Sequence, residues 1–133
     1  MPGFTLTSRA DAPVEEVWKL LFDPSRFPEW WAGVQTVRSG SPGEYTMWPE
    51  GYPDFPMPQQ LRTDHASGRV TISCQVSDID FAWRLAEAGA GTVIEVRVDL
   101  PEVEAHRLEG QRELIGESMS KLATLAESAN PRA

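Results

Sequence analysis

The sequence of 133 residues predicts one α+β domain, in which an antiparallel sheet is covered on one face by a long C-terminal helix. Two patterns carry this prediction. Between residues 34 and 100, apolar and polar residues alternate in short segments separated by turn-rich stretches, which is typical of antiparallel strands with one buried face. Residues 102–128 then place apolar side chains at helical spacing.

The N-terminal quarter predicts a strand followed by two short helices. Residues 4–10 alternate with a period of two. The next segment, 10–24, changes its period, and its apolar residues fall on one stripe of an amphipathic helix that Pro24 ends. A second short helix is expected over residues 25–31, where aromatic side chains stand at helical spacing: Phe27, Trp30 and Trp31.

Six further strands are expected after these helices. Turn residues separate their alternating segments, which makes the sheet antiparallel. The strands are predicted at residues 34–39, 44–48, 59–65, 69–76, 79–86 and 92–100. The segment 49–58 holds four prolines in ten residues, so it can be neither a helix nor a central strand, and we expect an ordered loop.

The C-terminal segment predicts the longest element. Its apolar residues recur at spacings of 7, 4, 3 and 4, and they are Leu108, Ile115, Met119, Leu122 and Ala126. Such a row lies on one face of a helix, and a helix over residues 102–128 would span ~40 Å. An element of that length needs a broad surface to cover, and the predicted sheet provides one.

The composition excludes several classes of function. The formal net charge of −8 disfavours nucleic-acid partners and anionic membrane surfaces. No apolar run reaches the ~18 residues of a membrane span, and the N-terminus lacks a signal-peptide pattern, so we expect a cytoplasmic protein without stable membrane association. A single cysteine, Cys74, excludes an internal disulfide.

The search for catalytic motifs gives one tentative residue. His65 shares the strand parity of Leu61 and Thr63, so it could face the apolar side of the sheet and act as an acid or base. A hydrogen-bonded histidine at the rim is the simpler interpretation. His65 and His106 lack ligand spacing, and we expect neither a metal site nor a cofactor.

The residues of two segments and the C-terminal helix resemble a known family. The segments are APVEEVWKLLFDPSRFPEWW at residues 12–31 and WRLAEAGAGTVIEV at residues 83–96. They resemble the START-related helix-grip superfamily (SRPBCC), and within it the polyketide cyclase/dehydrase and lipid-transport family. The resemblance covers nearly the whole chain, is weakest over residues 39–68, and implies a single domain over residues 1–133. It implies a curved seven-stranded antiparallel sheet wrapped around the C-terminal helix, with a cavity between them.

The resemblance also directs the search for ligand-binding residues. The candidates lie on the inward side of a strand, on the inner face of the long helix, in the proline-rich loop, or on the second short helix, which the resemblance places at the cavity mouth. They are Trp30, Trp31, Tyr52, Phe55, Leu61, Thr63, Ile72, Cys74, Phe81, Trp83, Ile115 and Met119. Core packing is the alternative for Trp30 and Trp31. It is also the alternative for Trp83, and an inert buried thiol is the alternative for Cys74. Tyr52 and Phe55 would either plug the cavity or flank its entrance.

The leading expectation for function is binding of a small, mostly apolar ligand, such as a polyketide-like aromatic or a lipid, between sheet and helix. A polyketide cyclase/dehydratase using acid/base residues in the cavity is the first alternative. A co-chaperone-like protein-interaction module is the second. An enzyme needs convergent titratable groups in the cavity, a binder needs apolar walls, and an interaction module needs a filled cavity with an exposed apolar patch.

Overall fold

A seven-stranded antiparallel sheet forms the frame of the protein, as the alternating segments predict. The computed structural model describes residues 2–129. The strands are β1 (Gly3–Ala10), β2 (Val34–Ser39), β3 (Glu44–Pro49), β4 (Met57–Asp64), β5 (Arg69–Cys74), β6 (Asp80–Ala88) and β7 (Gly91–Asp99). Their order in the sheet is β1-β7-β6-β5-β4-β3-β2, so the first strand closes one edge beside the last.

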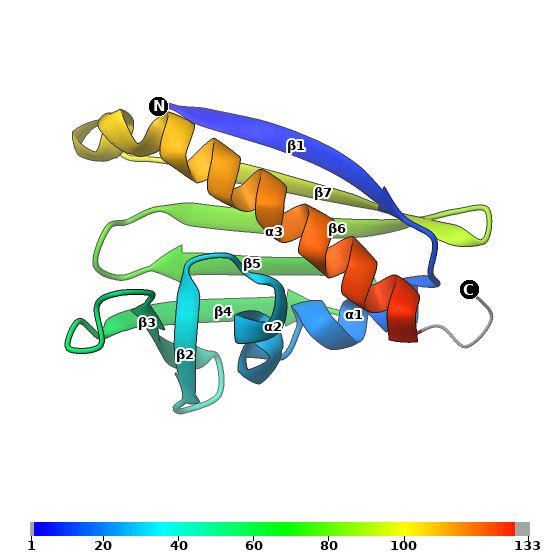
Figure 1. Ribbon diagram of the computed structural model, residues 1–133, viewed down its shortest axis with the longest axis horizontal. Coiled ribbons are helices and arrows are strands. Elements are labelled where there is room, and N and C mark those ends of the chain that lie inside the picture. Colours follow the sequence, from blue (N-terminus) through cyan, green and yellow to red (C-terminus); the bar gives the residue numbers. More distant parts are fainter. Residues whose placement is uncertain (1, 130–133) are drawn as a thin grey trace.

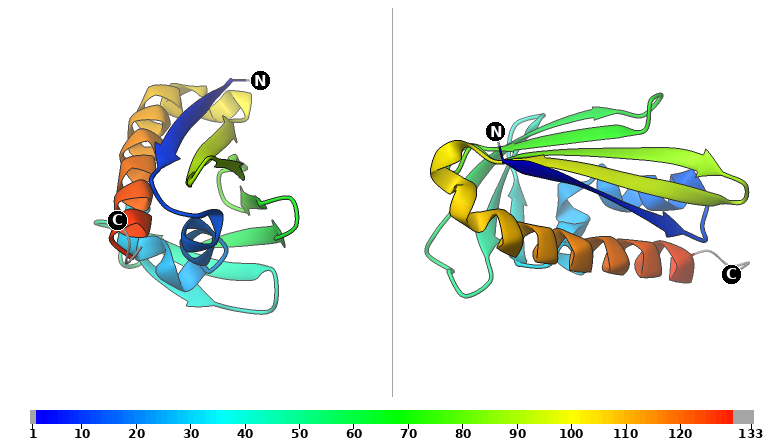
Figure 2. Two further views of the ribbon diagram at one scale, coloured as in Figure 1. Left: turned by 90° about the vertical axis from the view of Figure 1, so that its right-hand side faces the viewer. Right: turned by 90° about the horizontal axis from the view of Figure 1, so that it is seen from above.

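The helices follow the predicted order, with one difference at the start of the C-terminal helix. They are α1 (Val14–Leu21), η1 (Pro24–Arg26), α2 (Phe27–Trp30), η2 (Glu102–Arg107) and α3 (Leu108–Ala129). The predicted single helix from residue 102 begins as the 3-10 segment η2, which stands at an angle to α3 in Figure 2. α3 itself has 22 residues, or ~33 Å. None of the helices within residues 2–129 has the length and apolar character needed to cross a membrane.

The sheet curves around the helices, which all lie on its concave side (Figures 1 and 2). α3 runs diagonally beside β1, while α1 and α2 occupy the space below it, next to the later strands. The apolar row predicted for α3 faces this interior, since Ile115, Met119, Leu122 and Ala126 are buried. The helix-grip architecture is therefore confirmed.

An aromatic cluster joins α2 to the sheet. Trp30 is fully buried, and its indole Nε1 donates a hydrogen bond of 2.9 Å to the backbone oxygen of Leu20. Its ring meets that of Trp83 edge-on at a centroid distance of 5.4 Å. Trp31 packs against the same Trp83 ring at 5.6 Å. Such pairs add to the stabilisation from burial alone, and here they fix α2 against β6.

Ser118 ties α3 to the end of α2. Its hydroxyl accepts a hydrogen bond of 2.9 Å from the backbone N–H of Ala32 and donates one of 2.7 Å to the backbone oxygen of Leu114. Ser118 is completely buried, so the N–H of Ala32 depends on this partner. The connection between α2 and β2 is thereby fixed in position relative to α3.

Replacing Ser118 should therefore cost more than a helical serine usually does. We expect Ser118→Ala to lower the free energy of unfolding by about 1–3 kcal/mol, because the backbone N–H of Ala32 loses its partner. The exposed Ser120 on the same helix is the matched control, and Ser120→Ala should change stability by less than about 0.5 kcal/mol. Urea unfolding of both variants measures the difference, and equal stabilities would contradict the role given to Ser118.

Candidate ligand-binding pocket

A pocket of about 440 Å³ lies at one end of the concave face. Its lining comes from the β2–β3 hairpin, the loop 50–56, the adjoining ends of β4, β5 and β6, and the segment from η2 into α3. The volume falls within the range of ~300–1,000 Å³ that is usual for small-molecule sites. The pocket is partly open to solvent, so a ligand could enter without unfolding of the domain.

The walls of the pocket are mainly aromatic and thioether groups. Trp31 and Phe81 meet edge to face, with ring centroids 5.1 Å apart, and both are buried. Met47 and Met57 line the side formed by β3 and β4. Methionine side chains adapt to irregular shapes, so these walls can accept an apolar body without a fixed outline.

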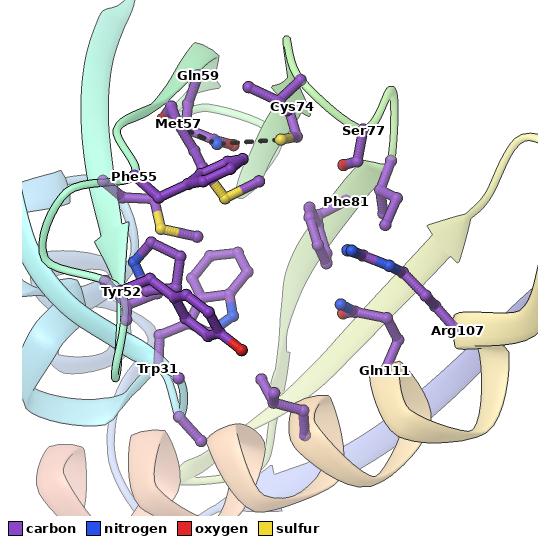
Figure 3. A pocket seen from close by; sticks show the side chains of 18 of the residues that line it. Trp31, Tyr52, Phe55, Met57, Gln59, Cys74, Ser77, Phe81, Arg107 and Gln111 are labelled. Carbon is purple, nitrogen blue, oxygen red and sulfur yellow. Dashed lines mark hydrogen bonds between the residues drawn. The ribbon is translucent and has the colours of Figure 1, made fainter. Parts of the chain in front are cut away.

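The loop 50–56 brings two large aromatic side chains to the mouth. Tyr52 and Phe55 line the pocket although they are 64% and 51% exposed. Figure 3 shows them on the side of the pocket opposite Arg107 and Gln111. Two successive backbone hydrogen bonds, from the N–H of Tyr52 to Pro49 and from that of Phe55 to Tyr52, order this proline-rich loop. The aromatic rings therefore flank the entrance.

A row of polar side chains crosses the inner face of the sheet inside this apolar surface. Tyr45 pairs with Gln59 in the β3–β4 register, and Gln59 pairs with Cys74 in the β4–β5 register. Each of the three is only 4% exposed and lines the pocket. The Gln59 Nε2 donates hydrogen bonds to Cys74 Sγ at 3.3 Å and to the backbone oxygen of Met57 at 3.2 Å.

The hydrogen-bonding capacity of this row is not used up. Burial, assisted by the nearby Cys74, raises the pKa of Tyr45 far above its usual range, so the phenol stays protonated and can donate. Within residues 2–129, neither the Tyr45 hydroxyl nor the Gln59 carbonyl oxygen has a hydrogen-bond partner. A ligand with a hydroxyl or carbonyl group could supply one.

The mouth carries one ion pair. Arg107 Nε lies 3.2 Å from Glu104 Oε2, and both residues line the pocket. Gln111, one helical turn further along, lines it as well. In Figure 3 the side chains of Arg107 and Gln111 point into the pocket beside Phe81.

The structure divides the predicted ligand-binding residues into two groups. Trp31, Tyr52, Phe55, Cys74 and Phe81 line the pocket. The remaining candidates do not: Trp30, Ile72, Trp83, Ile115 and Met119 are buried in the core, Leu61 packs against it half-buried, and Thr63 is exposed. Position along the sheet explains Thr63 and Trp83, which lie further than Gln59 and Phe81 from the end where β4 and β6 begin. Leu61 and Ile72 are in register with Phe81 and still do not line the pocket.

His65 lies outside the pocket. β4 ends at Asp64, so strand parity does not extend to His65, which falls in the following turn. Its ring stacks on Trp18 at a centroid distance of 4.7 Å, and its Nε2 lies 2.9 Å from Glu15 Oε1. The His65 side chain is exposed and lies beside α1. Among residues 2–129, no three His, Cys, Asp or Glu side chains come together in a way that could hold a metal ion.

Several lining residues were not among the predicted ones. Gln59 and Tyr45 had a usable signal, because Gln59 shares its parity with Leu61 and Tyr45 shares its parity with Met47. Arg107 had no such signal, since it precedes the regular helix and its direction depends on the 3-10 geometry of η2.

Comparison with known proteins identifies relatives by family and by fold. The family model described as polyketide cyclase / dehydrase and lipid transport matches residues 1–127. Among proteins with curated descriptions, none matches this chain in sequence.

Three solved structures illustrate the likeness in fold. A protein of Nitrosomonas europaea has 17% identity and a TM-score of 0.77, with 96% of this chain and 95% of that one covered. XoxI of Bacillus cereus has 14% identity and a TM-score of 0.75, with 93% and 94% covered. The di-domain ARO/CYC protein StfQ of the steffimycin biosynthetic pathway has 16% identity and a TM-score of 0.72, with 93% of this chain and 44% of that one covered.

The boundary between pocket and core can be tested with two tryptophan substitutions on α3. Met119 lies in the closed core, so Met119→Trp should cost about 1–3 kcal/mol of stability through overpacking. Leu114 borders the pocket, so Leu114→Trp should cost less than about 1 kcal/mol, because the larger ring can occupy the cavity. Thermal melts measure both changes. A large loss for Leu114→Trp, or none for Met119→Trp, would place the cavity elsewhere.

Proposed function

Because this chain belongs to the polyketide cyclase/dehydrase and lipid-transport family, we propose that it binds a small, mostly apolar molecule in the pocket. A polyketide-like aromatic compound or a lipid fits this description. The observation that carries the proposal is the combination of aromatic walls, formed by Trp31 and Phe81, with a polar row whose Tyr45 hydroxyl has no partner among residues 2–129. Apolar walls with a few directed polar groups are typical of small-molecule sites.

The expected affinity follows from the buried area. A ligand that buries ~300 Å² of apolar surface gains roughly 7 kcal/mol at ~25 cal/mol per Å². The pocket wall contributes a similar area, while association costs ~4–15 kcal/mol. The surplus lies between about 0 and 11 kcal/mol, so apolar burial alone can support binding, and polar contacts to the row would decide how tight it is.

A cyclase or dehydratase activity is the second candidate, supported by one feature of the pocket. The phenol of Tyr45, kept neutral by its raised pKa, could donate a hydrogen bond to a substrate carbonyl. The carboxylate that lines the pocket, Glu104, is paired with Arg107 at the mouth, and His65 lies on another surface. The mainly apolar lining therefore supports binding more strongly than it supports catalysis.

A protein-interaction module is the third candidate, and the pocket weighs against it. Such a module would have a filled cavity, whereas this site has a volume of about 440 Å³. The exposed aromatic residues Tyr52 and Phe55 belong to the pocket mouth, so ligand entry already explains their exposure.

Two exposed phenylalanines provide a matched test of binding. Phe55 lines the pocket, whereas Phe22 is similarly exposed, at 42%, and does not. We expect Phe55→Ala to weaken binding of the apolar probe N-phenyl-1-naphthylamine by roughly tenfold, since an aromatic wall is lost. Phe22→Ala should leave the affinity unchanged. Fluorescence titration measures both, and equal affinities of the two variants, or no binding by the unaltered protein, would contradict the proposal.

A further inference from the structure

We propose that the ligand is an amphipathic organic acid, whose apolar body lies between Trp31 and Phe81 and whose carboxylate is held at the mouth by Arg107 and Gln111. This inference rests on the proposed function and specifies the ligand class of the same pocket. It follows from the orientation of Arg107, the one cationic side chain among the described residues that line the pocket.

The geometry of Arg107 leaves most of its donors available. Its contact with Glu104, 3.2 Å long, uses Nε, and the two Nη groups bond to no other residue within 2–129. Figure 3 shows the guanidinium end directed into the pocket, with the Gln111 amide beside it. Arg107 ends η2 and Gln111 lies in the first turn of α3, and both side chains line the pocket. Their N–H groups can therefore bond to one carboxylate together.

Arg112, the next arginine along the chain, is not directed into the pocket as Arg107 is. It lies on α3 one residue after Gln111, but its guanidinium sits 5.2 Å from the ring centroid of Phe4, outside the pocket. It also pairs with Glu109 at 4.0 Å, along the helix surface. Arg112 thus has an ordinary packing role, whereas Arg107 points over the pocket.

The ion pair with Glu104 accounts for only part of the placement of Arg107. Glu104 Oε2 is buried and has no hydrogen-bond partner among residues 2–129, so the Arg107 charge compensates it through Nε. This contact does not engage the two Nη groups, and the Arg107 side chain stays 49% exposed at the mouth. The chain as a whole carries a net charge of −8, so general electrostatic attraction does not draw an organic acid to its surface. A guanidinium fork at an apolar mouth matches the planar, bidentate geometry of a carboxylate.

The half-exposed position of Arg107 also fits an amphipathic ligand. The carboxylate would stay in contact with solvent at the mouth, so it would lose only part of its hydration. The apolar body would meanwhile reach the aromatic walls, and a hydroxyl or carbonyl group on that body could reach Tyr45 or Gln59. Glu104 opposes the ligand charge, so its removal should favour binding.

A pair of fluorescent probes with one body tests the inference. 1-Pyrenebutyrate carries a carboxylate, and 1-pyrenebutanol replaces it with a neutral hydroxyl. We expect Arg107→Gln to weaken pyrenebutyrate binding about tenfold or more while the affinity for pyrenebutanol stays unchanged. The matched control Arg112→Gln should change neither affinity. Added salt should weaken pyrenebutyrate binding selectively.

Each other outcome overturns the inference in a recognisable way. If pyrenebutanol binds and Arg107→Gln affects both probes equally or neither, the carboxylate site is wrong while the binding function stands. If neither probe binds the unaltered protein, the proposed function fails as well. Glu104→Gln gives a second measurement should Arg107→Gln not fold: we expect tighter binding of pyrenebutyrate alone, and unchanged or weaker binding would contradict the inference.

Discussion

The packing of α3 across the concave face of the sheet is the contact on which the rest of the structure depends. Its buried residues pack against β1, α1 and α2, and α1 in turn packs against β6 and β7. Side chains do not fill one end of the concave face. The pocket is the space that remains where η2 meets α3 and where β4 and β6 begin. The cavity is therefore formed by the same strands, loop and helices that make up the fold, and no additional element is needed.

The lining changes character with depth, and this order matters for what can bind. Polar groups of Tyr45 and Gln59 lie on the sheet, aromatic walls stand above them, and an arginine faces the mouth. Tyr45 and Gln59 each keep a polar atom without a protein partner among residues 2–129, and a ligand with a hydroxyl or carbonyl group could bond to it. A molecule with polar groups at both ends of an apolar body would satisfy all three layers.

The elements were predictable from the sequence because each depends on a local period. Alternation identified the strands, and helical spacing identified α1 and α3. The pocket was only partly predictable, because it depends on which end of the interior is left unfilled. Phe81 and Trp83 share one parity on β6, yet Phe81 lines the pocket and Trp83 is sealed beneath Trp30 and Trp31. The structure places His65 outside the pocket for a different reason. β4 ends one residue before it, and its ring stacks on Trp18 at the surface.

The central claim is that a small apolar molecule occupies this pocket, and the five tryptophans allow a direct test. Trp31 lines the pocket, while Trp18 stacks on His65 at a distant surface. Fluorine NMR of protein labelled with 5-fluorotryptophan, assigned by single Trp→Phe variants, resolves each indole separately. During titration with N-phenyl-1-naphthylamine, the Trp31 resonance should move most and that of Trp18 should stay in place. A shift centred on Trp18, or saturable binding that leaves Trp31 unmoved, would contradict the account.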